Sequence, residues 1–178
     1  GFSKHMREDE EGTLDSLKTC RNIIDAVIHE QGGRIFHTAG DSVLAEFAGP
    51  INCVNAAVNF QNALYDRNKT APDADPFIAL EWRVGIHSGD VIVEQDNIYG
   101  NGVNIAARLE SQCNPGQILV SRTVSEQVST QLASITKAAG TRTLKNIASD
   151  FEVFTVETKA GSQPAARVDI AATSPEVT

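Results

Sequence analysis

Apolar positions in the first part of the chain follow the spacing of an amphipathic helix. They recur from Thr13 until the pair Gly32-Gly33, a common helix end, at Leu14, Leu17, Cys20, Ile24, Val27 and Ile28. Residues 4–12 are charged, and we expect a loop or a frayed helix start there. The same spacing predicts further helices, one opened by Gly49-Pro50, one from Gly102 to about Gln112, and one over residues 123–132.

Short apolar runs between turn residues predict the strands. One pair of predicted strands covers residues 34–36 and 43–47, on either side of a turn at 39–41. A second pair covers residues 80–86 and 91–93, on either side of a turn at 87–90. The two strands of each pair are expected to be hydrogen-bonded to each other. The other predicted segments are strands over residues 117–120, 143–147 and 151–156, and a surface loop over residues 66–76. Because helices and strands alternate, the sequence predicts a mixed α/β (α+β) domain in which helices cover a sheet.

Composition indicates one folded domain and a tail. The chain has 178 residues, of which 41% are hydrophobic, and this is enough for a sizeable core. We place the folded domain at residues 1–157. Residues 158–178 are rich in Ala, Ser and Pro and show no period, so we expect a disordered tail or linker there.

Charge, cysteines and hydropathy exclude several classes of protein. The net charge of -8 offers no basic stripe for a nucleic acid, but it allows a nucleotide whose charge a divalent metal ion balances. Cys20, Cys53 and Cys113 are unclustered, which argues against disulfides or a zinc site and favours a reducing cytoplasm. No apolar run reaches the roughly 18 residues of a membrane span, and no signal peptide opens the chain, so we expect no direct membrane insertion.

Two segments carry candidate chemistry. Asp41 stands in a Gly-containing turn between two apolar runs, where a carboxylate can bind a hard metal ion. Asn104 and Arg108 are one helical turn apart, directly after a Gly-rich loop at residues 100–102. A metal ligand, phosphate-facing backbone and a fixed cation are what chemistry on a nucleoside triphosphate needs. Ile105 stands where a dinucleotide fingerprint needs its third glycine, so that interpretation is discarded.

Each of these residues also has an ordinary explanation. Asp41 would be a plain turn residue, because Gly-Asp is common turn chemistry. Arg108 would form a surface salt bridge with Glu94 or Glu110. The ordinary explanation is weaker for Asn104, because an asparagine inside a helix disfavours the helix unless it serves another purpose.

Several motifs in a fixed order resemble the class III adenylate/guanylate cyclase catalytic domain. They are Gly-Phe-Ser at residues 1–3, GDSVLAEF at 40–47, RVGIHSGD at 83–90, IYGNGVNIAARLE at 98–110 and LKNI at 144–147. The resemblance covers residues 1 to about 157 and implies a ferredoxin-like βαββαβ core, whose first strand is expected to be missing from the chain as given. It also implies activity only as a dimer, with a second copy or a related cyclase subunit, and composite sites at the interface.

The resemblance assigns roles to the matching residues. Asp41 matches one of two aspartates that bind Mg²⁺ or Mn²⁺, and two ions are expected. Phe2 and Ser3 match a loop whose backbone holds the β- and γ-phosphates at a helix start. Asn104 would orient the ribose, and Arg108 would meet the charge that grows on the α-phosphate.

Two further positions belong to this assignment. Lys145 matches a lysine that reaches the triphosphate from a late strand. The family's other metal aspartate stands just before the Gly-Phe-Ser motif, upstream of Gly1, so the chain alone is expected to be crippled in catalysis. A minor alternative is that Asp169 supplies a substitute carboxylate from the tail.

The base-reading positions depart from the usual pattern. Adenylate cyclases usually have lysine at position 37 and aspartate at position 97, whereas this chain has His37 and Asn97, with Asp96 adjacent. A neutral imidazole can donate to adenine N1 and an amide carbonyl can accept from the N6 amine, so adenine remains readable. The pair also differs from the glutamate and cysteine typical of guanylate cyclases. ATP is therefore the expected substrate, with GTP as the alternative.

The resemblance thus implies an adenylate cyclase that makes 3′,5′-cyclic AMP and pyrophosphate by metal-assisted in-line attack of the ribose 3′-hydroxyl. His5, His29 and His87 are then expected to be structural or solvent-exposed. Guanylate cyclase activity is the first alternative. The second is a non-catalytic homologue that binds nucleotide or a partner subunit as a regulatory dimerisation module, which His37, Asn97 and the missing aspartate favour.

Overall fold

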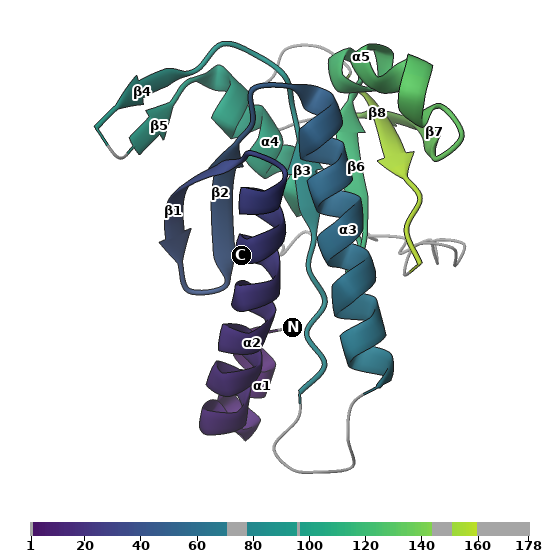
Figure 1. The fold of residues 1–178 in the computed structure, drawn as a ribbon. Helices are drawn as coiled ribbons and strands as arrows, with labels where there is room; N and C mark the ends of the chain where they lie inside the picture. Colours follow the sequence, from purple (N-terminus) through teal and green to yellow (C-terminus); the bar gives the residue numbers. More distant parts are fainter. Residues whose placement is uncertain (1, 71–77, 96, 144–150, 160–178) are drawn as a thin grey trace, which may run out of the picture.

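The computed structural model describes residues 2–70, 78–95, 97–143 and 151–159 (Figure 1). The helices are α1 (Phe2–Glu8), α2 (Glu10–Glu30), α3 (Pro50–Lys69), α4 (Asn101–Ser111) and α5 (Arg122–Leu132). The strands are β1 (Arg34–Ala39), β2 (Ser42–Glu46), β3 (Val84–Ile86), β4 (Ile92–Glu94), β5 (Asn97–Tyr99), β6 (Ile118–Ser121), β7 (Thr136–Arg142) and β8 (Phe151–Val156). Three predicted segments lie mostly outside the described residues, namely the loop at 66–76, the strand at 143–147 and the tail.

The strands form one four-stranded sheet and two hairpins. The sheet has the order β3-β6-β8-β7, with β3 parallel to β6 and the other neighbours antiparallel. β1 pairs with β2, and β4 pairs with β5, both antiparallel. This mixture of helices and strands confirms the predicted fold class.

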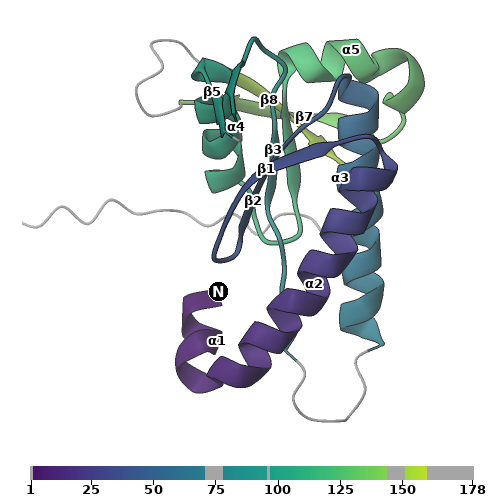
Figure 2. The same cartoon turned by 60° about the vertical axis from the view of Figure 1, so that its left-hand side comes forward.

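Helices cover both faces of the four-stranded sheet, as a comparison of Figure 1 with Figure 2 shows. The buried apolar residues of β6 alternate between two apolar clusters. Ile118 and Val120 belong to a cluster with residues of α2, α3 and α5, whereas Leu119 belongs to a cluster with Ile105 and Leu109 of α4. Since successive residues of a strand point to opposite faces, the sheet separates α4 from the other three helices.

The start of the chain, for which a loop or a frayed helix start was predicted at residues 4–12, is more regular than either. Most of that segment is helical, because α1 runs to Glu8 and α2 begins two residues later. Asp9, between them, caps α2, and its carboxylate accepts a hydrogen bond from the Gly12 N–H at 2.9 Å. The charged residues of this segment belong to α1, to the cap and to the exposed first turn of α2.

The ends of α2 and α3 follow from local signals to different degrees. α2 ends before Gly32, as predicted, and the φ of +73° at Gly32 suits glycine. The Gly33 N–H closes the helix end by donating to the Ile28 carbonyl at 2.8 Å. α3 begins at Pro50 as predicted but extends to Lys69, into the predicted loop.

Only the end of the strand predicted at residues 80–86 pairs in the sheet, as β3. Upstream of β3, the Gln61 side chain of α3 donates a hydrogen bond to the Trp82 carbonyl at 2.8 Å. The Trp82 carbonyl therefore accepts its hydrogen bond from a helix side chain and not from a neighbouring strand, as the predicted strand would require. The predicted pairing with residues 91–93 is also wrong, since β3 pairs with β6, and β4 pairs with β5.

Among the described residues, β2 and β3 each pair along one edge only, and no strand joins the β1–β2 hairpin to the sheet. A cavity of about 820 Å³ lies between β2 and β3. Its lining includes Val43 and Ala45 of β2, Val84 of β3, Ile24 of α2 and Phe60 of α3. Two strands with an open edge among the described residues therefore border one largely apolar space.

The backbone of α4 lies directly against β3 at Gly85. A Cβ added to Gly85 would lie 2.2 Å from the Ala106 carbonyl oxygen and 2.3 Å from the Glu110 nitrogen. Because both neighbours are helix backbone, neither can move aside by itself. This close approach sets the height of α4 over the sheet, and α4 carries Asn104 and Arg108.

Replacing Gly85 by alanine is expected to lower the free energy of unfolding by about 1–3 kcal/mol, because the added methyl group pushes α4 away from β3. Urea denaturation followed by circular dichroism measures this change. Gly49→Ala is the control, since a Cβ at Gly49 meets nothing within 4 Å. Equal stability of the two variants would contradict the close packing at Gly85.

Candidate functional site

The tip of the β1–β2 hairpin presents Asp41. The paired residues Ala39 and Ser42 leave a two-residue loop of Gly40 and Asp41, and the φ of +58° at Gly40 is one that glycine adopts without strain. The Asp41 side chain is exposed and has no hydrogen bond or ion pair within the described residues. A carboxylate held in a tight turn and free of partners suits a hard divalent cation.

Asp41 fits one ligand position of a metal site rather than a complete site. In the part of the chain that the structure describes, no group of three or more His, Cys, Asp or Glu side chains could hold a metal ion. The remaining ligands would have to be oxygen atoms from elsewhere. Phosphate oxygens of a nucleotide are of the right chemistry for Mg²⁺ or Mn²⁺.

The predicted phosphate loop and the predicted metal ligand meet at one cavity. Phe2 and Asp41 both line the cavity between β2 and β3. Phe2 is partly buried against the larger apolar cluster, and Ser3, in the first turn of α1, is exposed. The Ser3 carbonyl accepts a hydrogen bond from the Arg7 Nε at 3.3 Å. Gly1 lies outside the described residues.

Asn104 and Arg108 project from α4 as a polar pair. Asn104 is exposed and Arg108 is partly exposed, and among the described residues neither side chain has a hydrogen-bond or ion-pair partner. Glu110, which sequence analysis considered as a partner of Arg108, forms an ion pair with Arg83 instead, at 2.8 Å. The amide and the guanidinium are therefore available to a ligand.

This pair does not lie on the face of α4 that borders the cavity. The residues of α4 that line the cavity are Val103, Ala106, Ala107 and Glu110. Asn104 and Arg108 lie on a different face of the helix, since neither belongs to that lining. Within one copy of the chain, Arg108 therefore does not face the cavity that Asp41 lines.

The positions predicted to read the base lie on neighbouring elements. His37 lies in β1, and Asn97 begins β5 with an exposed side chain. β1 contacts β5, and the Arg34 Nη2 donates a hydrogen bond to the Gln95 carbonyl at 3.3 Å. Three other residues that sequence analysis named lie outside the described residues, namely Asp96, Lys145 and Asp169.

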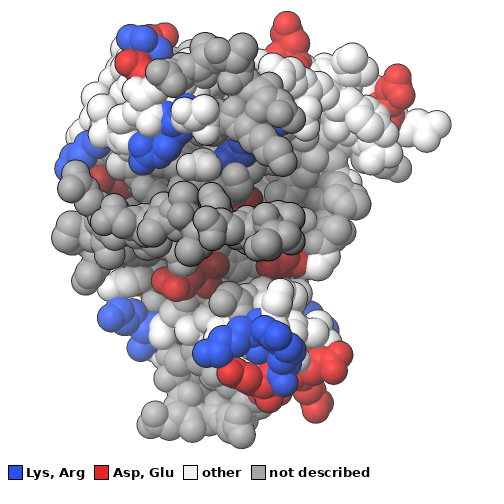
Figure 3. All heavy atoms as spheres, turned by 180° about the vertical axis from the view of Figure 1, so that it is seen from behind, with Lys and Arg blue, Asp and Glu red and all other residues white. Residues whose placement is uncertain are grey.

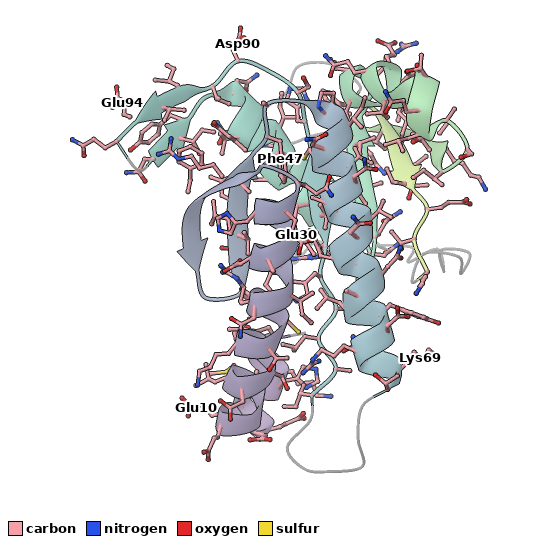
Figure 4. All side chains as sticks on the ribbon, in the orientation of Figure 1. Glu10, Glu30, Phe47, Lys69, Asp90 and Glu94 are labelled. Carbon is pink, nitrogen blue, oxygen red and sulfur yellow. The ribbon has the colours of Figure 1, made fainter. Side chains whose placement is uncertain are left out.

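The β4–β5 hairpin extends from the body of the molecule, with Glu94 at its tip and Asp90 on the chain that enters it (Figure 4). Ile98 of this hairpin is buried, but four large hydrophobic side chains of the segment are between 40% and 63% exposed; they are Val91, Ile92, Val93 and Tyr99. Contiguous apolar side chains on a projecting hairpin are typical of a surface that another protein covers.

A half-buried histidine next to α4 was not singled out as functional from the sequence, which indicated only a structural or solvent-exposed role. The His87 Nδ1 lies 3.0 Å from the Ser121 Oγ, and the His87 and Phe151 ring centroids are 6.1 Å apart. Burial lowers the pKa of the His87 imidazole, so the ring is neutral near pH 7. The signal in the sequence that could have identified His87 is its position directly after a predicted strand and two residues before Gly89.

The three cysteines are free thiols. Burial raises the pKa of Cys53 and of Cys113 to about 12, and it also raises the pKa of Cys20. Thiols that stay protonated are poor nucleophiles and poor metal ligands. The structure therefore gives these residues packing roles.

Acidic and basic side chains are mixed on the face shown in Figure 3. On that face the described Lys and Arg side chains stand beside Asp and Glu side chains, so the face carries no continuous basic stripe for a polyanion. Among the helices that the structure describes, none combines the length and apolar character needed to cross a membrane.

Comparisons with known proteins agree with this geometry. The family model described as the adenylate and guanylate cyclase catalytic domain matches residues 1–158. A Rhizobium meliloti (strain 1021) protein named putative adenylate cyclase 3 is 33% identical over 156 residues, which are 87% of this chain and 26% of that protein. An adenylate cyclase of Streptomyces coelicolor is 31% identical over 131 residues, which are 72% of this chain and 32% of that protein.

A solved structure has the same fold. The adenylate/guanylate cyclase/hydrolase from Silicibacter pomeroyi is 31% identical and matches with a TM-score of 0.76, over 86% of this chain and 89% of that chain. The ferredoxin-like cyclase fold expected from the motifs is thereby confirmed. The chain spans only 26% and 32% of the length of the two relatives from Rhizobium meliloti and Streptomyces coelicolor.

Proposed function

Because the chain belongs to the family of adenylate and guanylate cyclase catalytic domains, we propose that it converts ATP into 3′,5′-cyclic AMP and pyrophosphate. The observation that carries this proposal is the pair Asn104 and Arg108, one turn apart on α4 and without partners among the described residues. The relatives from Rhizobium meliloti and Streptomyces coelicolor are both named as adenylate cyclases, which supports ATP as the substrate.

In the proposed reaction the ribose O3′ attacks the α-phosphorus of ATP in line. The bond from O3′ to the α-phosphorus forms, the bond from that phosphorus to the oxygen bridging to the β-phosphate breaks, and pyrophosphate leaves. The 3′-hydroxyl proton is released. Negative charge grows on the α-phosphate oxygens, and a guanidinium can stabilise it through two parallel hydrogen bonds. Arg108 has this role.

The remaining polar groups hold the substrate in the reactive geometry. Asn104, one turn before Arg108, has an amide that can donate to and accept from the ribose. The first turn of α1, at Phe2 and Ser3, offers backbone N–H groups to the β- and γ-phosphates. Lys145 adds a point charge for the triphosphate. Fixing the ribose and the phosphates together converts binding energy into alignment of O3′ with the α-phosphorus.

Asp41 is the proposed ligand of a Mg²⁺ or Mn²⁺ ion. Such an ion supplies Lewis acidity that favours the ionised 3′-hydroxyl and the leaving pyrophosphate. We infer that a second carboxylate, needed for a second ion, belongs to an extended segment in the cavity between β2 and β3. The open edges of both strands support this inference. So does the largely apolar cavity between them, which Phe2 and Asp41 both line.

We infer that two cyclase domains, either two copies of this chain or this chain and a related subunit, form the active site together. Arg108 of one copy does not face the cavity that Asp41 lines, which supports a site in which the two residues come from different subunits. The exposed apolar side chains of the β4–β5 hairpin support such a contact. In the pair, Arg108 of one subunit completes the site that contains Asp41 of the other.

His37 and Asn97 are proposed to read the base as adenine. A neutral imidazole donates to adenine N1, and the Asn97 carbonyl accepts from the N6 amine. Guanine carries a hydrogen on N1 and an oxygen at C6, so both hydrogen bonds would have to reverse. The contact of β1 with β5 supports a shared role of these positions.

A reducing compartment, the cytoplasm, is the proposed location of the domain. The three cysteines are free, and two of them are buried. Proteins of oxidising compartments more often pair such residues in disulfides.

The test is turnover of ATP and of GTP, with Mn²⁺, by the natural polypeptide that contains these residues. Cyclic AMP as the main product, with kcat/KM at least about tenfold higher for ATP than for GTP, supports the proposal. Cyclic GMP as the main product would overturn the base assignment. The double variant His37→Lys with Asn97→Asp, which restores the usual adenine-reading pair, should keep the preference for ATP. Nucleotide binding without any cyclic product would overturn the activity.

A further inference from the structure

The imidazole of His87 lies between Ser121 and Phe151 of the sheet and the first turn of α4. Its Nδ1 lies 3.0 Å from the Oγ of Ser121, which is fully buried at the end of β6. The ring of Phe151, at the start of β8, lies 6.1 Å away between centroids. Toward the helix, a Cβ added to Gly102 would lie 3.6 Å from the His87 Cδ2, and one added to Gly89 would lie 3.2 Å from the Nε2.

Ser121 uses its side chain for this contact. It is the residue before α5, but its hydroxyl makes no capping hydrogen bond to that helix. Among the described residues, His87 is the hydrogen-bond partner of the Ser121 hydroxyl. Because a buried hydroxyl without a partner costs free energy, this bond holds the imidazole in one orientation.

α4 is thereby supported at two places. Gly85 of β3 contacts the backbone of the helix at Ala106 and Glu110. His87, two residues further along the chain, lies beside the first turn, because a Cβ added to Gly102 would be 3.6 Å from its Cδ2. The contact at Gly85 sets the distance of α4 from the sheet. The His87 ring beside the first turn limits the tilt of α4 and its rotation about its own axis. Asn104 and Arg108 follow Gly102 within the next two turns, so both side chains depend on that rotation.

We propose that His87 is a positioning residue, whose ring, oriented by Ser121, holds the first turn of α4 so that Asn104 and Arg108 reach the substrate. The effect on turnover rests on the proposed cyclase function, whereas the effect on α4 does not. The lowered pKa keeps the ring uncharged near pH 7, so both nitrogens can serve hydrogen bonds without burying a charge. No contact of His87 with the substrate is part of this proposal.

The experiment compares His87→Ala, His87→Asn and Ser121→Ala in the natural polypeptide, with His29→Gln on the exposed face of α2 as the control. Amide hydrogen exchange is followed over residues 98–105 and over α2, together with kcat and KM for ATP. We expect His87→Ala to speed exchange over residues 98–105 only, and to lower kcat by about 10- to 100-fold with KM little changed. Ser121→Ala should change both quantities in the same direction by less.

His87→Asn tests for partial rescue, because the asparagine amide can place a polar atom near the position of the imidazole Nδ1. It should restore part of the exchange protection that His87→Ala loses, and part of kcat. If His87→Ala does not fold, Ser121→Ala and His87→Asn decide the question by the same exchange measurement.

Unchanged exchange over residues 98–105 in folded His87→Ala would overturn the proposal. So would faster exchange throughout the domain, because His87 would then stabilise the whole fold rather than place α4. Local loosening of α4 in a protein whose wild type makes no cyclic nucleotide would support the contact between His87 and α4 while overturning the proposed function. The two failures are therefore distinguishable.

Discussion

Replacing Arg108 by alanine is expected to lower kcat for ATP by about 10²- to 10³-fold, equivalent to about 3–4 kcal/mol of transition-state stabilisation. The guanidinium has no partner among the described residues, so its removal breaks no described ion pair and should leave the unfolding temperature near that of the wild type. KM should change little, because the interaction grows as charge develops on the α-phosphate. Steady-state kinetics of the natural polypeptide measure both constants.

Arg83→Ala is the matched control. It removes an arginine beside the same helix, one that forms an ion pair with Glu110 at 2.8 Å, and exposed pairs contribute about 1 kcal/mol or less. Its kcat should stay near that of the wild type. Arg108→Lys should fall between the wild type and Arg108→Ala, because lysine keeps the charge but loses the bidentate geometry. A kcat of Arg108→Ala within about threefold of the wild type would contradict a catalytic role for this residue.

Mixing Asp41→Ala with Arg108→Ala is expected to recover about one quarter of the wild-type activity from two variants that each retain about 1% or less. When the subunits mix at random, half of the dimers contain one copy of each variant. In such a dimer, one of the two sites combines Asp41 of one subunit with Arg108 of the other, and the second site lacks both. Activity measured against the mixing ratio should peak at equal amounts of the two variants.

The control for mixing is the double variant Asp41→Ala with Arg108→Ala, combined with Arg108→Ala. No pairing of these chains places both native residues at one site, so activity should stay at background. Native mass spectrometry shows whether mixed dimers have formed. Mixed dimers of the two single variants without any recovery of activity would show that Asp41 and Arg108 do not serve a shared site.

Local signals predicted the helices well and the strands less well. α2 and α3 have a clear apolar period, and the end of α2 at Gly32 and the start of α3 at Pro50 follow from the sequence alone. β7, by contrast, was not predicted, because Thr136–Arg142 consists of small and polar residues and pairs only with β8 at the sheet edge. The strand exists because β8 offers it an edge rather than because of its own pattern.

In the candidate site, too, local features could be predicted from the sequence and features that depend on packing could not. Asp41 in its turn, and Asn104 with Arg108 on one helix, could be singled out because turn chemistry and helical spacing are local. Their orientation could not be predicted, because it depends on the contact of α4 with Gly85, which only packing reveals. Packing likewise placed the His87 ring, which needs partners from β6 and β8.

The open edges of β2 and β3 matter for how the 178-residue chain behaves in solution. Unpaired strand edges beside an apolar cavity are a template onto which a strand of another molecule can add. At high concentration the isolated chain is therefore expected to self-associate by strand addition, in competition with any contact through the β4–β5 hairpin. The mass of such assemblies would report sheet extension rather than the catalytic pairing, so the pairing is best measured at low protein concentration.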